Sequence, residues 1–445
     1  MKTLKDFIRQ LLYYPSAVIG MSVVFLLIAL AIYAMIKIPY SKAIRLWRGG
    51  EDVWYQNPKF AAPAWINFFS SKKYSESFVV NTNDGSFSSE FTPGAEDTGT
   101  LLASHTIDFN YDTYPQDMIL YFTAAFAEKQ PFISLEWLTP DGRTVRIANL
   151  AIAKQQTYRF AQDEKLKVRL KTDDIIAALF SDPATGSLIK GPYQLLITGT
   201  TFEPDSKIDV EFVFHGQVYG LAGTDQARRD LVVPLLWGAP IALMFGLIAS
   251  LGSSVLTMVI AAIGAWYAGW VDALIQRITE INLVLPFLSI LVMIGTFYSR
   301  SIWVILGATI MLSIFTGAIK SFRSIFLQVK ESMYIEAARA YGASSLRIVF
   351  IYLIPRMIPL LIPGLVSAVP AFVFLEASLA VLGLGDPVLP TWGKMIDDAN
   401  RNGALYRGYY YWILEPTVLL MFTGLGFAML GFALDRIFNP KLRET

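Results

Sequence analysis

Long stretches without a charged side chain constrain this sequence more than any other feature. A helix needs about 20 apolar residues to cross the hydrocarbon core of a bilayer. The uncharged windows are residues 16–36, 231–271, 281–299, 301–319, 357–375 and 416–434. The window at 231–271 is about twice the length of one span, and Pro234 and Pro240 predict a break at its start. We therefore expect an interfacial helix near 231–238, a span at about 240–265, and six spans in all.

The composition fits an α-helical membrane protein and excludes several kinds of site. Only 16% of the residues are charged, against about 25% in soluble domains. The chain has no cysteine, so disulfides, thiolate chemistry and cysteine-bound metals are excluded. His105 and His215 are its two histidines, and we expect ordinary surface or core residues rather than metal ligands. A net charge of +1 gives no indication of a nucleic-acid partner.

Basic residues set the expected orientation, because Lys and Arg concentrate in cytoplasmic loops. The loop at 320–356 carries six of them, and both ends of the chain are basic as well. With six spans these three regions fall on one side, which predicts a multi-pass protein of the plasma (inner) membrane with both termini cytoplasmic. The first window runs into Lys37 without a small-residue cleavage site, so we expect an anchored span rather than a signal peptide.

Residues from about 38 to 229 differ in character from the rest of the chain. Strand-like runs such as "MILYFTA", "FISLEWL" and "KIDVEFVF" are separated by turn formers. We expect a β-rich, sandwich-like domain outside the cytoplasm, with a short helix at 173–180. The expected division is 1–37 for the cytoplasmic N-terminus and first span, 38–222 for the inserted domain, and 223–445 for five further spans.

Three carboxylates in this region, Asp108, Asp112 and Asp117, lie close together in sequence. Their spacing does not fit an EF-hand, and the segment lacks the glycine which that loop requires. A solvated loop is the expectation, with a calcium site as the alternative.

The stretch "EAARAYGASSLRIVFIYLIP" at 336–355 is polar and alanine-rich although it lies between two apolar windows. Gly342 is placed to end one helix in the left-handed region, so that a second starts near Ala343. Ala337, Ala338 and Ala340 are small enough for another surface to approach closely. The residues alone leave two interpretations open: a knob that transmits force into a cytoplasmic partner, or an amphipathic helix on the lipid headgroups.

The spacing of Glu336, Ala337, Ala338, Gly342 and Pro355 resembles the cytoplasmic EAA loop of binding-protein-dependent ABC importer permeases. The segment "GTDQARRD" (223–230) is similar to the GTDxxGRD pattern of the dipeptide, oligopeptide and nickel permeases, with Arg228 at the usual Gly. Further similar segments are 264–288, 375–385, 390–396 and the tail "NPKLR" at 439–443. The inserted domain resembles nothing in that family.

The resemblance implies a six-span type I ABC importer permease. In it the EAA loop (about 321–355) would form the coupling helix that docks in a groove of the ATPase subunit. The implied partners are a second homologous permease, two ABC ATPases and an extracytoplasmic solute-binding protein. The implied cargo is di- or oligopeptides, although relatives that carry nickel or oligosaccharides leave it open. No cofactor is expected in this chain, because ATP would be bound by the partner ATPases.

Two absent motifs agree with a permease that is not itself an enzyme. The sequence has no G-x-x-x-x-G-K-[ST] phosphate loop and no G-x-S-x-G nucleophile elbow. The alternative function is a membrane-anchored receptor or enzyme that acts through the 38–229 domain.

Two further residues are candidates for the pathway or outer gate. Glu376 lies near the end of an apolar window and should face protein or water, because a carboxylate in lipid costs about 2.5–3.5 kcal/mol. Its alternative is local pairing with Lys394. Trp392 is expected at the membrane surface, with direct ligand contact as the alternative. Gly383 and Gly385 predict a sharp turn between these candidates.

Overall fold

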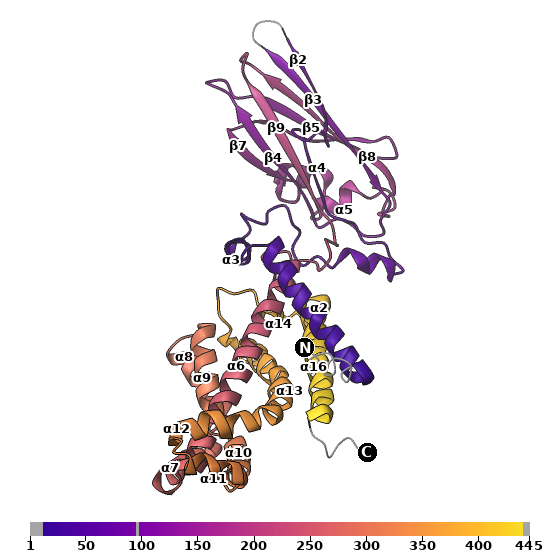
Figure 1. Cartoon of the computed structure of the whole chain (residues 1–445). Helices are drawn as coiled ribbons and strands as arrows, with labels where there is room; N and C mark the ends of the chain where they lie inside the picture. Colours follow the sequence, from indigo (N-terminus) through magenta and orange to yellow (C-terminus); the bar gives the residue numbers. More distant parts are fainter. Residues whose placement is uncertain (1–11, 95–97, 439–445) are drawn as a thin grey trace. The chain divides into compact units, whose positions relative to one another are not determined.

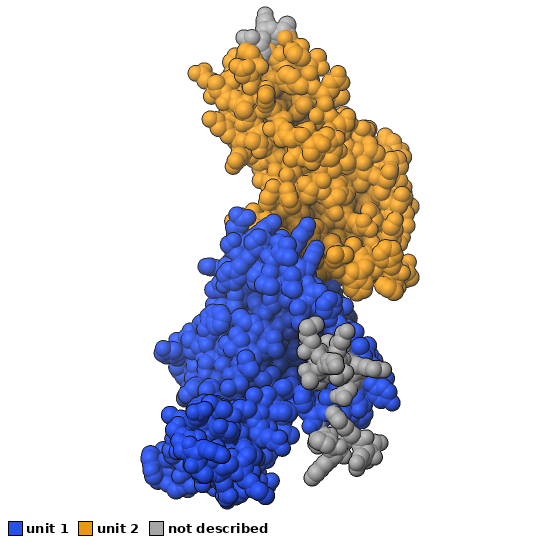
Figure 2. All heavy atoms as spheres, in the orientation of Figure 1, with its two compact units in different colours: residues 1–48, 233–445 blue, residues 49–232 orange. Residues whose placement is uncertain are grey.

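The computed structural model describes residues 12–94 and 98–438, and the chain divides into two compact units (Figure 2). One unit comprises Met1–Arg48 and Val233–Thr445, and the other is Gly49–Val232. The second unit therefore begins and ends later than the expected 38–222 domain. The tail motif at 439–443 and the basic residues of the N-terminus lie outside the described residues.

The unit Gly49–Val232 is a sandwich of two antiparallel sheets, which confirms the predicted β-rich domain. In the described residues a four-stranded sheet has the order β1-β9-β4-β7, and a five-stranded sheet has the order β2-β3-β8-β5-β6. The strands are β1 (Phe78–Asn81), β2 (Ser88–Pro93), β3 (Gly99–Phe109), β4 (Asp117–Ala125), β5 (Phe132–Leu138), β6 (Thr144–Ala151), β7 (Gln155–Arg159), β8 (Gly191–Thr201) and β9 (Lys207–His215). Alternate residues of the strands, such as Phe122, Trp137, Tyr193 and Phe212, fill one core between the sheets.

Short helices complete this unit. They are the 3₁₀ turns η1 (Ala64–Phe68) and η2 (Phe160–Gln162), and the helices α4 (Glu164–Leu170) and α5 (Ile175–Leu179). The helix predicted at 173–180 is thus confirmed by α5, which Asp174 caps by accepting a hydrogen bond from the Ala177 amide at 2.9 Å.

The loop carboxylates have local partners. Asp112 accepts a hydrogen bond from the Lys73 amide at 2.7 Å and pairs with Lys190. Among the described residues, no group of three acidic or histidine side chains is arranged to hold a metal ion.

The other unit is helical (Figure 1). Its elements are α2 (Pro15–Lys37), α3 (Tyr40–Arg48), α6 (Val232–Tyr267), α7 (Gly269–Val284), α8 (Phe287–Phe297), α9 (Ile302–Ile314), α10 (Gly317–Lys330), α11 (Met333–Ala340), α12 (Ser345–Arg347), a π-helical turn η3 (Ile348–Leu353), α13 (Ile354–Leu379), a second π-helical turn η4 (Ala380–Leu384), α14 (Trp392–Arg401), α15 (Ala404–Arg407) and α16 (Tyr411–Phe438).

Four helical stretches of the described chain are long and apolar enough to cross a membrane. They are Pro15–Lys37, Val232–Tyr267, Ser345–Leu384 and Tyr411–Phe438. The expected spans at 281–299 and 301–319 fall on bent pairs instead: α7 and α8 meet at 79°, and α9 and α10 at 48°. The chain is therefore a helical membrane protein with up to six crossings, if each bent pair counts as one.

The predicted break in the 231–271 window is wrong, because α6 is one helix of 36 residues with Pro240 in its interior. Proline removes one amide but leaves its φ helical, and contacts from neighbouring helices can satisfy the freed carbonyls in a membrane protein. The Trp392 indole donates a hydrogen bond to the Leu235 carbonyl, 2.9 Å away, which joins α14 to this part of α6.

Small residues allow α2 and α16 to pack closely side by side (Figure 1). A Cβ atom built on Gly20 would lie 2.7 Å from the Leu430 nitrogen and 2.8 Å from the Gly426 oxygen. Such contacts are typical of helix pairs in membranes, where close backbone approach supplies much of the association energy.

Candidate functional site

The predicted coupling segment forms α10, α11 and α12, which lie with α7 at one end of the helical unit (Figure 1). The short helix α11 begins after Ser332 and has two different faces. Ile335 and Ala338 are buried and join a cluster that includes Met258 and Ala265 of α6. The segment is therefore docked on its own chain along one side only.

The opposite face of α11 is exposed. Glu336, Ala337 and Ala340 lie there, and Met333 and Tyr341 flank them with 87% and 92% of their surfaces exposed. The expectation that Ala338 belongs to this approach surface is wrong, because it lies on the buried side. Met333 and Tyr341 were not predicted from the sequence. Each lies four residues from Ala337, and this spacing places residues on the same face of a helix.

Gly342 adopts the left-handed conformation that was predicted, with a φ of 78°. The Ala343 amide donates a hydrogen bond to the Ala338 carbonyl at 3.0 Å, which closes α11 in the manner of a Schellman cap. A Cβ atom on Gly342 would meet nothing within 4 Å. Glycine is therefore favoured by backbone conformation and not by lack of space within the chain.

Pro355 lies in the first turn of α13, but it does not interrupt the helix. The helical stretch is continuous over Ser345–Leu384 and contains a π-helical turn at Ile348–Leu353 just before the proline. The Ile354 amide donates to the Val349 carbonyl, five residues back. This wider turn accommodates a residue that has no amide and whose ring would clash in a regular helix.

Two basic residues attach the coupling segment to the end of α6. The Lys330 ammonium donates hydrogen bonds to the carbonyls of Ala265 and Trp266, both at 3.0 Å. A cation there also interacts favourably with the C-terminal end of the helix dipole. The Arg339 guanidinium of α11 lies over the Trp266 ring, 4.5 Å from its centroid. These contacts join α10 and α11 to the end of α6.

A third basic residue links α10 to α7. The Arg323 guanidinium pairs with the Asp272 carboxylate through two nitrogens, with Nε 2.7 Å from Oδ1 and Nη2 2.5 Å from Oδ2. Two-point pairing of this kind fixes geometry as well as distance. The basic residues of this loop thus hold the segment together in addition to setting its expected orientation.

Glu376 is buried near the end of α13, with 7% of its surface exposed. It lines a small hollow with Arg300, Ile305 and Asp386, and the Thr391 side chain hydrogen-bonds to it. Local pairing with Lys394 is wrong, because that ammonium lies 2.8 Å from a carboxylate oxygen of each of its helix neighbours, Asp397 and Asp398.

The turn between the two candidates is as expected: Gly383 has a φ of 85°, and a Cβ on Gly385 would lie 2.9 Å from the Ala380 Cβ. Trp392, in contrast, is 1% exposed and is not at the surface. Its ring packs so closely on Gly238 that a Cβ there would lie 2.1 Å away. Trp392 holds the start of α14 against α6.

Residues 254–444 match the family described as "Binding-protein-dependent transport system inner membrane component". The chain is 30% identical over 228 residues to the dipeptide transport system permease protein of Alkalihalophilus pseudofirmus, covering 50% of this chain and 72% of that protein. The chain belongs to this family of transport permeases. It is also similar to the dipeptide permease of Bacillus subtilis (28% identical; 50% of this chain, 69% of the relative) and to the oligopeptide permease of the same organism (29%; 50% and 72%).

This permease departs from the family pattern at Arg228, where the structure shows why glycine is usual. Arg228 has a φ of 64°, in the left-handed region. The strain is offset by contacts of its buried guanidinium, which donates to the Asn57 carbonyl at 2.6 Å and lies 3.3 Å from the His215 ring. Burial and the nearby Arg228 charge lower the pKa of His215 to about 3, so this histidine is neutral in the folded permease.

Proposed function

We propose that this permease forms half of the translocation pathway of an ATP-driven importer for di- or oligopeptides. The observation that supports this best is the exposed, small-residue face of α11 on a segment tied to α6 by Lys330 and Arg339. A partner that moves α11 would move α6 with it. The similar proteins are permeases of dipeptide and oligopeptide transport systems, which supports the cargo class.

The proposed topology has six crossings, with each bent helix pair counted as one and both termini cytoplasmic. The basic residues of the 320–356 loop support a cytoplasmic position for α11. The β-sandwich, which follows the first crossing, then lies on the outer side of the inner membrane. A second homologous permease would complete the pathway, and an extracytoplasmic solute-binding protein would deliver the cargo.

Two ABC ATPase subunits would bind and hydrolyse the ATP, so this chain needs no cofactor of its own. In the proposed cycle the ATPases close on ATP, and their groove moves the exposed face of α11. Because Arg339 and Lys330 join α11 and α10 to the end of α6, the movement would shift the equilibrium between inward- and outward-facing states.

Glu376 is the residue we propose for the pathway or outer gate. It is a buried carboxylate beside a small hollow, close to Arg300 and Asp386, and ionisable groups at such depth commonly mark transport pathways. Trp392, the second candidate from the sequence, supports Glu376 indirectly by holding α14 and Thr391 beside it. A membrane-anchored receptor or enzyme is not favoured, because the similarity lies in the helical half.

Charge reversal on α11 tests the proposal. Glu336→Arg should lower co-purification of the ATPase subunits and reduce substrate-stimulated ATP hydrolysis in proteoliposomes, since Glu336 lies on the exposed face. Glu128→Arg, an exposed reversal in the sandwich, is the matched control and should change neither. Full complex formation and full coupling in Glu336→Arg would refute α11 as the coupling helix.

A further inference from the structure

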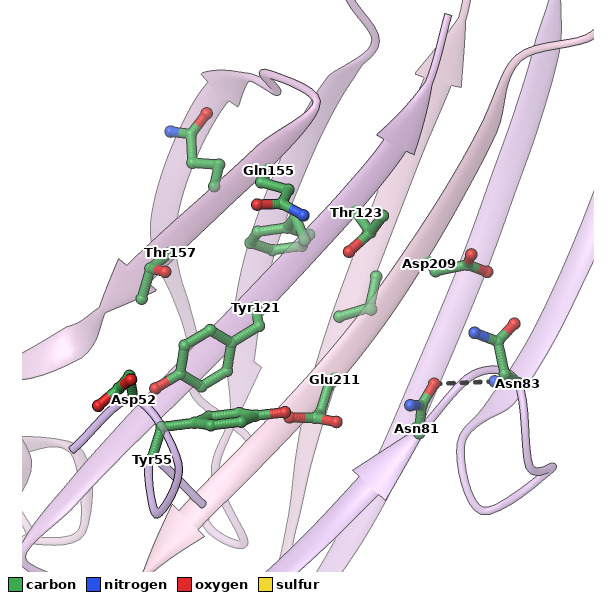
Figure 3. Close-up of a pocket in the computed structure, with 13 residues that line it drawn as sticks. Asp52, Tyr55, Asn81, Asn83, Tyr121, Thr123, Gln155, Thr157, Asp209 and Glu211 are labelled. Atoms are coloured by element: carbon green, nitrogen blue, oxygen red, sulfur yellow. Dashed lines mark hydrogen bonds between the residues drawn. The ribbon is translucent and has the colours of Figure 1, made fainter. Parts of the chain in front are cut away.

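The outer face of the four-stranded sheet carries a hollow of about 580 Å³ to which the proposed function assigns no role. Figure 3 shows its lining, which comes from β1, β4, β7 and β9 and from the loop before β1. The volume is within the range of about 300–1,000 Å³ that is usual for small-molecule sites. The hollow lies entirely within the unit Gly49–Val232.

Cross-strand pairing builds the floor of this hollow from polar side chains. Asn81, Glu211, Tyr121 and Thr157 form one row across the four strands, because each pairs with the next. A second row runs through Asp209, Thr123 and Gln155. Alternate residues of a strand point to the same face, so both rows point away from the core.

A segment of the chain covers the rest of this sheet face and forms one wall. The Tyr55 ring meets the Tyr121 ring edge to face, with centroids 4.8 Å apart, and the Tyr55 carbonyl lies 3.2 Å from His215. On the covered half the outward-pointing Ile119 and Val213 are fully buried. On the open half Thr123, Gln155 and Thr157 are exposed. The hollow begins where the cover ends.

One atom of the floor lacks a partner. Gln56 donates a hydrogen bond to Oε2 of Glu211 at 3.2 Å, and the Tyr55 hydroxyl also hydrogen-bonds to this carboxylate, whereas the buried Oε1 has no hydrogen-bond partner in the geometry of the described residues. An unpaired buried acceptor is costly, so a hydroxyl or amine donor from a ligand would be favoured at this point.

The chemistry of the lining restricts the ligand. Its carboxylates are Asp52, Asp209 and Glu211, and none of the described lining residues is Lys or Arg. These carboxylates are not grouped as metal ligands. Amide, hydroxyl and carboxylate groups spread around two tyrosine rings match a molecule with many hydroxyls and an apolar ring face. A phosphorylated or uronic-acid ligand would be repelled.

We propose that this sheet face binds an oligosaccharide of neutral or amino-substituted units. The Tyr121 and Tyr55 rings contact the sugar ring, Glu211 accepts from a hydroxyl or amino group, and Asn81 and Gln155 bind further hydroxyls. A second hollow, which shares Gln156 and Thr157 with the first, extends across β7 and gives the chain of sugar units a path. Its lining balances Arg159 and Lys165 against Asp163 and Glu164, so the repulsion of acidic units comes from the first hollow.

Titration calorimetry on the full-length chain in lipid nanodiscs tests the proposal. The probes are cellohexaose, the hexasaccharides of glucosamine and of N-acetylglucosamine, and a galacturonic-acid hexasaccharide. We expect binding of at least one of the first three, and at least tenfold weaker binding of the acidic probe. No binding of any neutral or amino probe, or equal binding of the acidic one, overturns the proposal.

Variants locate the site. Tyr121→Ala and Glu211→Gln should each weaken binding about tenfold, whereas Glu136→Gln, on the outer face of the other sheet, is the matched control and should not. Tyr121→Phe keeps the ring and should bind within about threefold of the wild type, which separates lost contact from lost folding. Wild-type affinity in both Tyr121→Ala and Glu211→Gln overturns the proposal.

Two further experiments distinguish a cell-wall glycan from a transported oligosaccharide as the source of the ligand. Tyr121-dependent co-sedimentation with isolated peptidoglycan would indicate cell-wall glycan. Tyr121-dependent stimulation of ATP hydrolysis by the free oligosaccharide would indicate cargo. Tyr121-dependent binding of a peptide mixture but of no oligosaccharide would replace the proposal with a peptide site.

Discussion

Replacing Gly342 tests whether backbone conformation at the end of α11 controls coupling. Its φ of 78° costs an ordinary L-residue about 1–2 kcal/mol. A new Cβ would meet no atom within 4 Å, so the cost comes from backbone strain rather than from a clash of the Cβ. A destabilisation of that size shifts an equilibrium by a factor of about 5–30. Gly342→Val should therefore lower the equilibrium constant for the left-handed turn that ends α11 roughly tenfold, and the population of that turn by up to the same factor.

A matched variant isolates this cause. Gly342→Asn adds a side chain of similar size, but asparagine tolerates the left-handed conformation better than a β-branched residue. We expect Gly342→Val to weaken ATPase association by up to about tenfold, because apparent affinity falls with the competent fraction, and Gly342→Asn to change it by less than about threefold. Co-purification measures association, and hydrogen exchange over 333–347 measures the turn. Equal behaviour of the two variants, or wild-type association in Gly342→Val, would refute the reasoning.

Three other predictions address topology, packing and pH. Single cysteines at Tyr341 and Ala184, both exposed, should react with an impermeant thiol reagent from the cytoplasmic and outer sides respectively; labelling of both from one side contradicts the six-crossing topology. Gly20→Leu should separate α2 from α16 and lower the melting temperature of the permease in detergent, whereas Gly307→Leu, where a Cβ would meet nothing within 4 Å, should change it little. His215 has a folded pKa of about 3, below its usual value near 6.5, so the unfolded state binds the extra proton first. The sandwich should therefore lose about 1.4 kcal/mol per pH unit as the pH falls from 6.5 to about 3. His215→Gln should flatten that slope in melts of the full chain, and an unchanged slope would exclude His215 as its cause.

Much of the helical architecture could be predicted from uncharged windows, because hydrophobic length determines where a helix can cross a bilayer. The sandwich could be predicted from alternation for a similar reason. Pro240 led to a wrong boundary, since proline does not always break a helix that neighbouring helices hold in place. In the structure α6 continues through Pro240, and a π-helical turn precedes Pro355 without interrupting the helix. Such compensations depend on tertiary contacts that one sequence does not display.

The candidate site was predictable where it depends on local conformation and not where it depends on packing. Gly342 was correctly placed in the left-handed region, because glycine after an alanine-rich helix is a strong local signal. Ala338 was assigned to the wrong face, since only the contact with α6 decides which side of α11 is buried. The two polar rows of the sandwich could not be predicted, because the order β1-β9-β4-β7 pairs strands that lie far apart in sequence.

That strand order has a consequence for how this protein can diverge. Each outer-face position, such as Asn81, Thr123 or Asp209, alternates with a core position on the same strand, so its side chain can change without altering the volume of the core. The wall is different, because the segment that carries Tyr55 is held by the Arg228 guanidinium at Asn57. Mutations can therefore change the side chains of the open sheet face at little cost in stability. The size of that face is harder to change, because the contacts that hold the wall also stabilise the fold.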